Sequence, residues 1–225
     1  MLEKRNFAMN PSLPETEKRR LEVLWQYEVL DSMPEEVFDD LVELAAYICE
    51  APIALITLVD EQRQWFKSQV GISIKETTRD ISFCTHAIAH QHLFVVPDTL
   101  ADPLFAKNPF VVSKPKIRFY AGAPLLTADG HSLGTLCVLD KVPRQLRPDQ
   151  GKALQVLARH VMSHLESRRS SGEATRLREE RDELRRELNR LKSREKPVTR
   201  TVKTLSRPAR KSRASSNHRS APRKR

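Results

Sequence analysis

The sequence has few cysteines and no long apolar run, and both absences exclude classes of protein. Only three cysteines occur among the 225 residues. An odd and sparse set cannot form the disulfide framework of a small secreted domain, and it fits a reducing compartment. The longest strongly apolar stretch, residues 52–59, is far shorter than the roughly 18 residues of a membrane-spanning helix. Because the N-terminus also lacks the apolar core of a secretory signal, the sequence predicts a cytoplasmic protein without a membrane span.

Acidic residues are absent from residues 197–225, which contain ten lysines and arginines. The other 29 basic residues balance the 29 acidic ones, so the net charge of +10 belongs to this stretch. With almost no bulky apolar residue, it is predicted to be a basic disordered tail. Nonspecific binding of DNA or RNA is one interpretation, and attachment to an acidic membrane or a solubilising role are two others. The candidate nucleic-acid contacts are Arg207, Arg210, Lys211, Arg213, Arg219, Arg223, Lys224 and Arg225.

Apolar residues recur at helical spacing in three parts of the chain. A first helix is expected over residues 17–29 and a second over residues 35–49. Ser32 and Glu35 have the spacing of a capping box, which would start the second helix. Pro148 stands at a favoured helix start, and apolar residues at helical spacing follow it.

Between these helices the pattern changes to that of strands. Residues 53–59 are almost wholly apolar and β-branched, which is typical of a strand buried on both faces. Residues 64–70 and 93–97 follow as shorter strands, with a short helix over residues 84–91 between them. Alternating residues 117–125 and the returning residues 133–139 flank an Asp-Gly turn. Tight turns between consecutive strands predict an antiparallel sheet flanked by helices, an α+β architecture.

The chain divides by composition into four parts. A flexible leader is expected over residues 1–16, the α+β domain over 17–168, a helical extension over 169–196 and the tail over 197–225. The sequence Ser170-Ser171-Gly172 is expected to interrupt the last helix. Beyond it, apolar residues follow a coiled-coil pattern, with Arg181 at one core position. A short helix that dimerises and a solvated charged helix explain this pattern equally well. The apolar stripe consists of Ala174, Leu177, Leu184, Leu188 and Leu191.

A series of short motifs gives a more specific indication. They are Val29-Leu30-Asp31, Val59-Asp60-Glu61-Gln62-Arg63-Gln64-Trp65-Phe66, Phe83-Cys84-Thr85-His86-Ala87-Ile88, Val96-Pro97-Asp98, Asp102-Pro103-Leu104-Phe105, Asn108-Pro109, Ile117-Arg118-Phe119-Tyr120-Ala121-Gly122-Ala123-Pro124-Leu125, Gly130 and Leu133-Gly134-Thr135-Leu136-Cys137-Val138-Leu139-Asp140. Over residues 17–165 this string resembles the GAF domain family, in the branch found in bacterial sensor kinases and cyclic-dinucleotide enzymes.

The resemblance implies a central antiparallel sheet with helices packed behind it. Members bind small molecules such as cyclic nucleotides, bilins or haem on the other face of the sheet, and many serve as dimerisation or signalling units. No kinase, cyclase or phosphodiesterase segment follows the domain in this sequence. We therefore expect a homodimeric sensory or regulatory protein that binds a small ligand or a protein partner and is not an enzyme. A nucleic-acid-associated protein acting through its tail, and a thiol-based GAF reductase, are the alternatives.

Six residues are candidates for ligand binding, each with a structural alternative. Cys84, His86 and His90 cluster on one predicted helix, where the two imidazoles could chelate a metal; no further ligand is evident, so no metal site is predicted and the cofactor stays unknown. Packing as small hydrophobic and hydrogen-bonded side chains is the simpler interpretation. Two more candidates share one face of a strand and could hold an anion, or the cation could pair locally. These two are Arg118 and Tyr120. Cys137 could meet Cys84 across the sheet as a redox pair.

Overall fold

The computed structural model describes residues 13–194, and its centre is a six-stranded antiparallel sheet. The strands lie in the order β3-β2-β1-β6-β5-β4. Their bounds are Ile53–Val59 for β1, Arg63–Val70 for β2, Glu76–Thr78 for β3, Phe94–Val96 for β4, Phe119–Leu126 for β5 and Ser132–Asp140 for β6. The predicted α+β class with an antiparallel sheet is confirmed.

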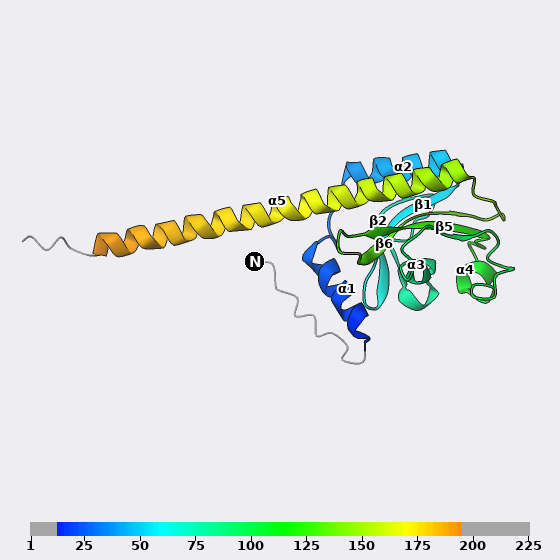
Figure 1. Cartoon of the computed structure of the whole chain (residues 1–225), viewed down its shortest axis with the longest axis horizontal. Coiled ribbons are helices and arrows are strands. Elements are labelled where there is room, and N and C mark those ends of the chain that lie inside the picture. The colour runs from blue at the N-terminus through cyan, green and yellow to red at the C-terminus, as the bar shows by residue number, and fades with distance from the viewer. Residues whose placement is uncertain (1–12, 195–225) are drawn as a thin grey trace, which may run out of the picture. The chain divides into compact units, whose positions relative to one another are not determined.

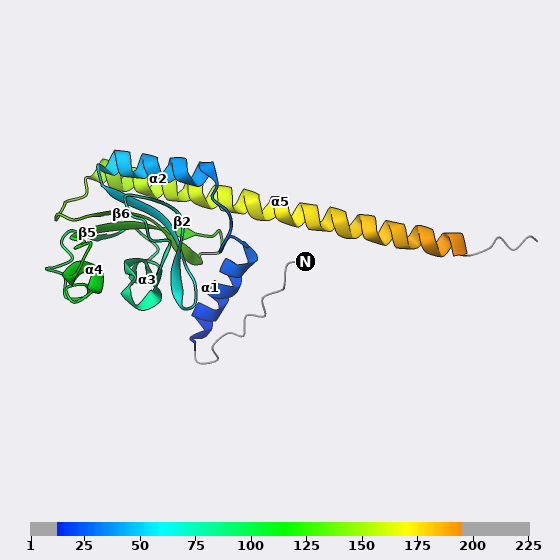
Figure 2. The ribbon, with the colours of Figure 1, turned by 180° about the vertical axis from the view of Figure 1, so that it is seen from behind.

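Helices cover both faces of this sheet. Figures 1 and 2 show α2 and α5 side by side over one face, with α3 and α4 on the other side. The helices span Glu15–Gln26 for α1, Glu36–Cys49 for α2, Phe83–Ala87 for α3, Pro109–Val112 for α4 and Pro148–Arg194 for α5. Residues 71–82, which follow β2, contain β3 and a single 3₁₀ turn.

The central strand β1 is buried along its whole length, as its apolar sequence predicts. Since successive strand residues point to opposite faces, β1 contributes to two separate apolar clusters. Ile56 and Leu58 pack under α2 and α5, whereas Ile53 and Leu55 pack toward α3 and α4. The same alternation on β5 places Phe119, Ala121, Ala123 and Leu125 in the first cluster and Tyr120 in the second.

The capping box expected at the start of α2 does not form. Glu35 is the residue before the helix, and its side chain makes no capping hydrogen bond. Both side chains of the predicted box instead bind the Lys67 ammonium, which is fully buried on β2. Ser32 Oγ accepts from Lys67 at 2.9 Å and the Glu35 carboxylate at 2.6 Å, with the Met33 carbonyl accepting at 2.7 Å. The three N–H donors of the lysine are thereby satisfied.

The last helix continues without a break through Ser170-Ser171-Gly172, so the expected interruption is wrong. An exposed glycine costs a helix only about 1 kcal/mol relative to alanine, which a helix of 47 residues can absorb. The Ser171 carbonyl, moreover, accepts a hydrogen bond from the Thr175 hydroxyl at 2.9 Å. By backbone contacts the chain separates into two units, one ending at Glu179 and the other beginning at Glu180.

Charged and aromatic residues bind α5 to the segment between α1 and α2. Tyr27 donates a hydrogen bond to the Glu166 carboxylate, and the Arg169 guanidinium lies 5.2 Å from the Tyr27 ring centroid. Arg168 lies 3.4 Å from the Glu35 carboxylate, and Arg176 pairs with Glu28. These contacts hold the part of the helix that leaves the sheet.

No helix within residues 13–194 is long and apolar enough to cross a membrane. The basic tail of residues 197–225, with every candidate nucleic-acid contact named above, lies outside the described residues.

Candidate functional site

The second apolar cluster leaves a cavity of about 40 Å³ between the sheet and the loops around α3 and α4. Its walls come from β1, β2, β3, α3, α4, β5 and β6 and from the loops between them. Three of the six predicted ligand-binding residues line it. They are Cys84, Tyr120 and Cys137.

A network of thiols and hydroxyls forms one wall of this cavity. The sulfur atoms of Cys84 and Cys137 lie 3.8 Å apart. Cys84 Sγ accepts hydrogen bonds from the hydroxyls of Thr135 at 3.0 Å and Tyr120 at 3.3 Å. The Thr135 hydroxyl lies 3.2 Å from that of Thr57. Both cysteines are free thiols and are buried.

Local features of the sequence explain how these side chains meet. Ser82 caps α3 by accepting a hydrogen bond from the Thr85 amide, which fixes the turn that carries Cys84. The Tyr120 ring stacks on Phe83 with 5.4 Å between the ring centroids. Gly122 gives the tyrosine its space, because a Cβ atom there would lie 2.2 Å from the Tyr120 hydroxyl. Without a side chain at that position, the hydroxyl reaches the thiols.

The network separates the acidities of the two thiols. Burial raises the pKa of Cys84, but hydrogen bonds from four neighbouring groups oppose this effect and lower its pKa below the usual value. Burial raises the pKa of Cys137, and the adjacent Cys84 raises it further. Burial and Cys84 likewise raise the pKa of Tyr120. Of the two thiols, Cys84 therefore has the greater tendency to ionise.

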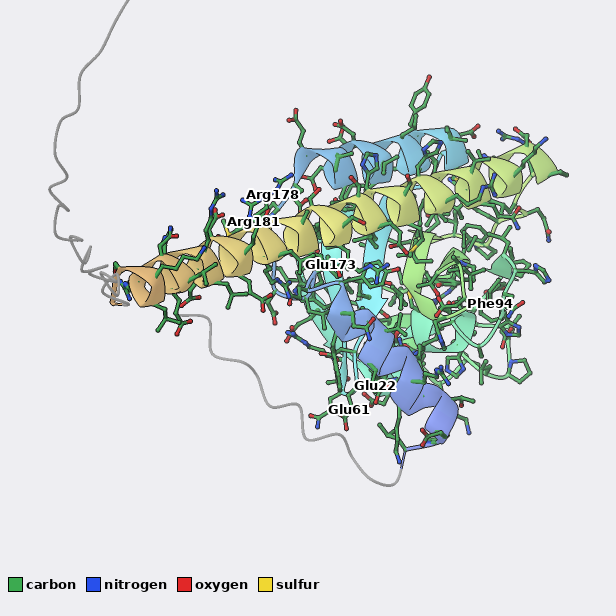
Figure 3. The ribbon with its side chains drawn as sticks, turned by 60° about the vertical axis from the view of Figure 1, so that its left-hand side comes forward. Glu22, Glu61, Phe94, Glu173, Arg178 and Arg181 are labelled. Carbon is green, nitrogen blue, oxygen red and sulfur yellow. The ribbon has the colours of Figure 1, made fainter. Side chains whose placement is uncertain are left out.

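The other three candidates do not line the cavity. His86 packs against Phe105 with 5.1 Å between the ring centroids, and burial lowers the pKa of this histidine. His90 stacks on Phe94, which Figure 3 labels, at 5.0 Å. Because α3 ends at Ala87, the two imidazoles are not on consecutive turns of one helix. Among residues 13–194 no group of three or more potential metal ligands is found.

Arg118 lies just before β5 and donates to two backbone carbonyls, those of Val111 at 2.8 Å and Ile117 at 2.9 Å. It therefore organises the loop between α4 and β5. Asp98 and Asp102 bind nearby backbone amides, as turn-capping carboxylates do.

The sequence interpretation missed two polar residues of the network, Thr57 and Thr135, and most of the cavity wall. Thr57 is a single hydroxyl within an otherwise apolar strand that is buried on both faces, and this contrast was a usable signal. Gln64 and Ser82 line the cavity and are hydrogen-bonded to each other. No local pattern marks the residues of distant loops that complete the wall.

The cavity predicts an order of reactivity among the thiols. A small thiol reagent such as methyl methanethiosulfonate is expected to modify Cys84 first in the native chain, because its pKa is lowered and it lines the cavity. Cys49 is expected to react much later, since burial raises its pKa to about 11. Mass spectrometry of peptides after timed quenching measures the order, and a Cys84→Ser chain is the control. Earlier modification of Cys49 would contradict the described network.

The fold and this cavity define an α+β domain of the signalling type, with helices behind an antiparallel sheet and a small apolar cavity in front of it. The GAF domain family model matches residues 33–165, and the chain belongs to the GAF domain family. A cyclic di-GMP phosphodiesterase of Pseudomonas aeruginosa is 43% identical over 162 residues, which make up 72% of this chain and 28% of that protein.

Solved structures agree on the fold. The GAF domain of a phosphoenolpyruvate-protein phosphotransferase from Coxiella burnetii has a TM-score of 0.53 at 14% identity, covering 71% of this chain and 99% of that one. A type II free methionine-R-sulfoxide reductase from Thermoplasma acidophilum has a TM-score of 0.50 at 10% identity, covering 59% of this chain and 92% of that one. At these identities the likeness shows the fold alone.

One expectation from the sequence is contradicted by these comparisons. We expected a protein that is not an enzyme because no catalytic segment follows the domain, yet the 43% identical relative is named for an enzymatic activity. This chain spans 28% of the length of that relative, so the absence of a catalytic segment here was no basis for the expectation.

Proposed function

We propose that the chain is a sensory module of cyclic di-GMP signalling, in which a small molecule in the cavity controls the pairing of α5 with α5 of a second chain. The observation that carries the proposal is the cavity lined by Cys84, Tyr120 and Cys137 in a GAF domain whose last helix has an exposed apolar stripe. The pathway is inferred from the 43% identical phosphodiesterase.

The apolar stripe on α5 requires a partner to be buried. Four leucines of the stripe are between 50% and 60% exposed. They follow a heptad repeat, with Leu177, Leu184 and Leu191 at d positions and Leu188 at an a position. Burial of such a stripe against an identical one removes apolar surface from water, which favours a dimer.

Charges beside the stripe specify the orientation of that dimer. All g positions are acidic and all e positions are basic, and in a parallel pair each g residue lies near the e residue five positions later in the other chain. Every such pair joins a glutamate to a lysine or arginine, whereas an antiparallel pair would bring like charges together. The g residues are Glu173, Glu180 and Glu187, and the e residues are Arg178, Arg185 and Lys192. Figure 3 labels Glu173 and Arg178.

Leu184→Asp is expected to convert a dimeric full chain into a monomer, because it places a carboxylate in the middle of the paired stripe. Ser193→Asp is the matched control: it makes the same change of charge at an f position and should leave the dimer intact. Sedimentation velocity over a concentration series measures both. A wild-type chain that remains monomeric throughout the micromolar range would contradict the pairing.

The signalling role has its own test. Production of the full chain in a bacterium that makes cyclic di-GMP is expected to change the level of that nucleotide, and Leu184→Asp should abolish the change while Ser193→Asp preserves it. Quantification of extracted nucleotide by mass spectrometry decides the matter. An unchanged level with the wild-type chain would overturn the assignment to this pathway.

A further inference from the structure

A basin lined by three lysines lies on the surface beside the cavity. The cavity and the basin adjoin, because they share four apolar lining residues: Ile72, Ile74, Phe110 and Pro115. The remaining residues of the basin are Lys114, Lys116 and Lys141. All three are exposed, none forms an ion pair within the described part of the chain, and no carboxylate lines the basin.

The interior of the cavity has the opposite character. Its lining contains no charged residue, and its few polar groups are hydroxyls, thiols and the Gln64 amide. A charged group inside would lose its hydration without gaining a counter-ion, which is very costly. The Thr77 hydroxyl, which lines the cavity, is buried and has no hydrogen-bond partner among the described residues. The uncharged lining of the cavity therefore favours an apolar group, whereas the lysines of the basin favour an anion.

The volume restricts the length of the apolar part. A site for one water molecule takes about 10–15 Å³, so about 40 Å³ admits roughly three groups of that size. An apolar cavity that holds benzene measures about 150 Å³, which excludes an aromatic ring here. Haem, bilins and cyclic nucleotides, the ligands that the family resemblance suggested, are larger still.

We propose that the cavity binds a short unbranched carboxylate of the size of butyrate, with its alkyl chain among the isoleucines and its carboxylate beside Lys114, Lys116 and Lys141. This inference rests on the proposed function, in which the cavity is the ligand site. An alkyl chain of three carbons fills the cavity, and the lysines supply the attraction for the charge that stays outside it.

The inference is tested on the full chain with butyrate as the probe. Titration followed by the methyl resonances of isoleucine is expected to shift Ile53, Ile72 and Ile117, which line the cavity, and to leave Ile56 on the other face of the sheet unchanged. Three probes serve as controls: acetate has the charge without the alkyl chain, 1-butanol has the chain without the charge, and octanoate has a longer chain. Each is expected to bind at least about fivefold more weakly than butyrate. Added sodium chloride should weaken butyrate binding, because exposed charges are screened.

Two variants locate the site. Lys114→Gln, Lys116→Gln and Lys141→Gln together are expected to weaken butyrate binding about fivefold or more, whereas the charge-matched set Lys107→Gln, Lys152→Gln and Arg159→Gln should not. Ile74→Trp, at a residue that is 37% exposed, should block the entrance while the melting temperature of the free chain is retained.

Equal binding of butyrate and 1-butanol, or unweakened binding of butyrate by the triple lysine variant, would show that the lysines do not recognise a carboxylate. Shifts confined to residues outside the cavity would overturn the location. Each of these results leaves the dimer and the signalling role standing, because those are measured by sedimentation and by nucleotide level.

Discussion

Gly134→Ala is expected to destabilise the domain by about 3 kcal/mol, at the upper end of the usual cost of overpacking. Gly134 lies on β6 opposite Leu58 of β1, in the middle of the sheet. A Cβ atom there would lie 1.8 Å from the Thr57 carbonyl oxygen and 2.8 Å from the Leu58 Cα atom. Both are backbone atoms of the central strand, so no side-chain rotation relieves the contact, and β1 and β6 must separate.

Gly172→Ala is the matched control, and the sign of its effect is expected to be opposite. A Cβ atom at Gly172 meets nothing within 4 Å, and the residue is helical. Alanine should therefore stabilise the helix by about 1 kcal/mol. Urea denaturation followed by circular dichroism measures both changes. If Gly134→Ala were tolerated as well as Gly172→Ala, the close pairing of β1 and β6 would be wrong.

The second large effect is expected at the buried lysine on β2. Glu35→Ala should cost about 3 kcal/mol, because it leaves the Lys67 ammonium buried without its counter-ion. Lys67→Met should cost clearly less, since the Glu35 carboxylate is 35% exposed and retains Arg168 at 3.4 Å. Glu35→Ala should be the more costly change because it leaves a fully buried charge unpaired, whereas Lys67→Met leaves a carboxylate that water still reaches.

Denaturant unfolding of the two single variants and of the double variant gives the three free energies required. The double variant, which buries no charge, is expected to be more stable than Glu35→Ala alone. A larger loss from Lys67→Met than from Glu35→Ala would contradict the burial of the ammonium. Ser68→Ala on the same strand removes only a hydrogen bond, the one its hydroxyl donates to Asp39, and serves as the reference for a smaller polar loss.

Periodicity in the sequence was sufficient to predict the sheet. The apolar run of β1 corresponds to burial on both faces of the sheet. The alternation along β5 corresponds to its two apolar clusters, because successive side chains of a strand point to opposite faces. Predictions from short sequence motifs failed where a residue distant in the sequence binds the same side chains. Ser32 and Glu35 have the spacing of a capping box, but Lys67, which is 35 and 32 residues later, respectively, binds both. Nothing within a window of a few residues could reveal that competition.

The candidate site could be predicted only in part, because its residues are distant in the sequence and meet only in the folded chain. Cys84 and Cys137 are 53 residues apart and meet because β6 lies beside β1 and β5 at the centre of the sheet, with α3 over them. His86 and His90 were grouped on an assumed longer helix, and the end of α3 at Ala87 separates them. The lysines of the basin come from the loop before β5 and from the residue that follows β6, and only the folded chain brings them together.

Phe66 and Lys67 are consecutive residues of β2, and they point to opposite sides of the sheet. Phe66 is part of the cavity wall, while Lys67 binds Glu35, whose carboxylate also meets Arg168 of α5. A single peptide bond thus separates a residue of the cavity wall from the lysine whose partner, Glu35, contacts α5. Three acceptors hold the ammonium, and one of them, Glu35, also contacts Arg168, so a single residue of β2 links the strand beside the cavity wall to α5.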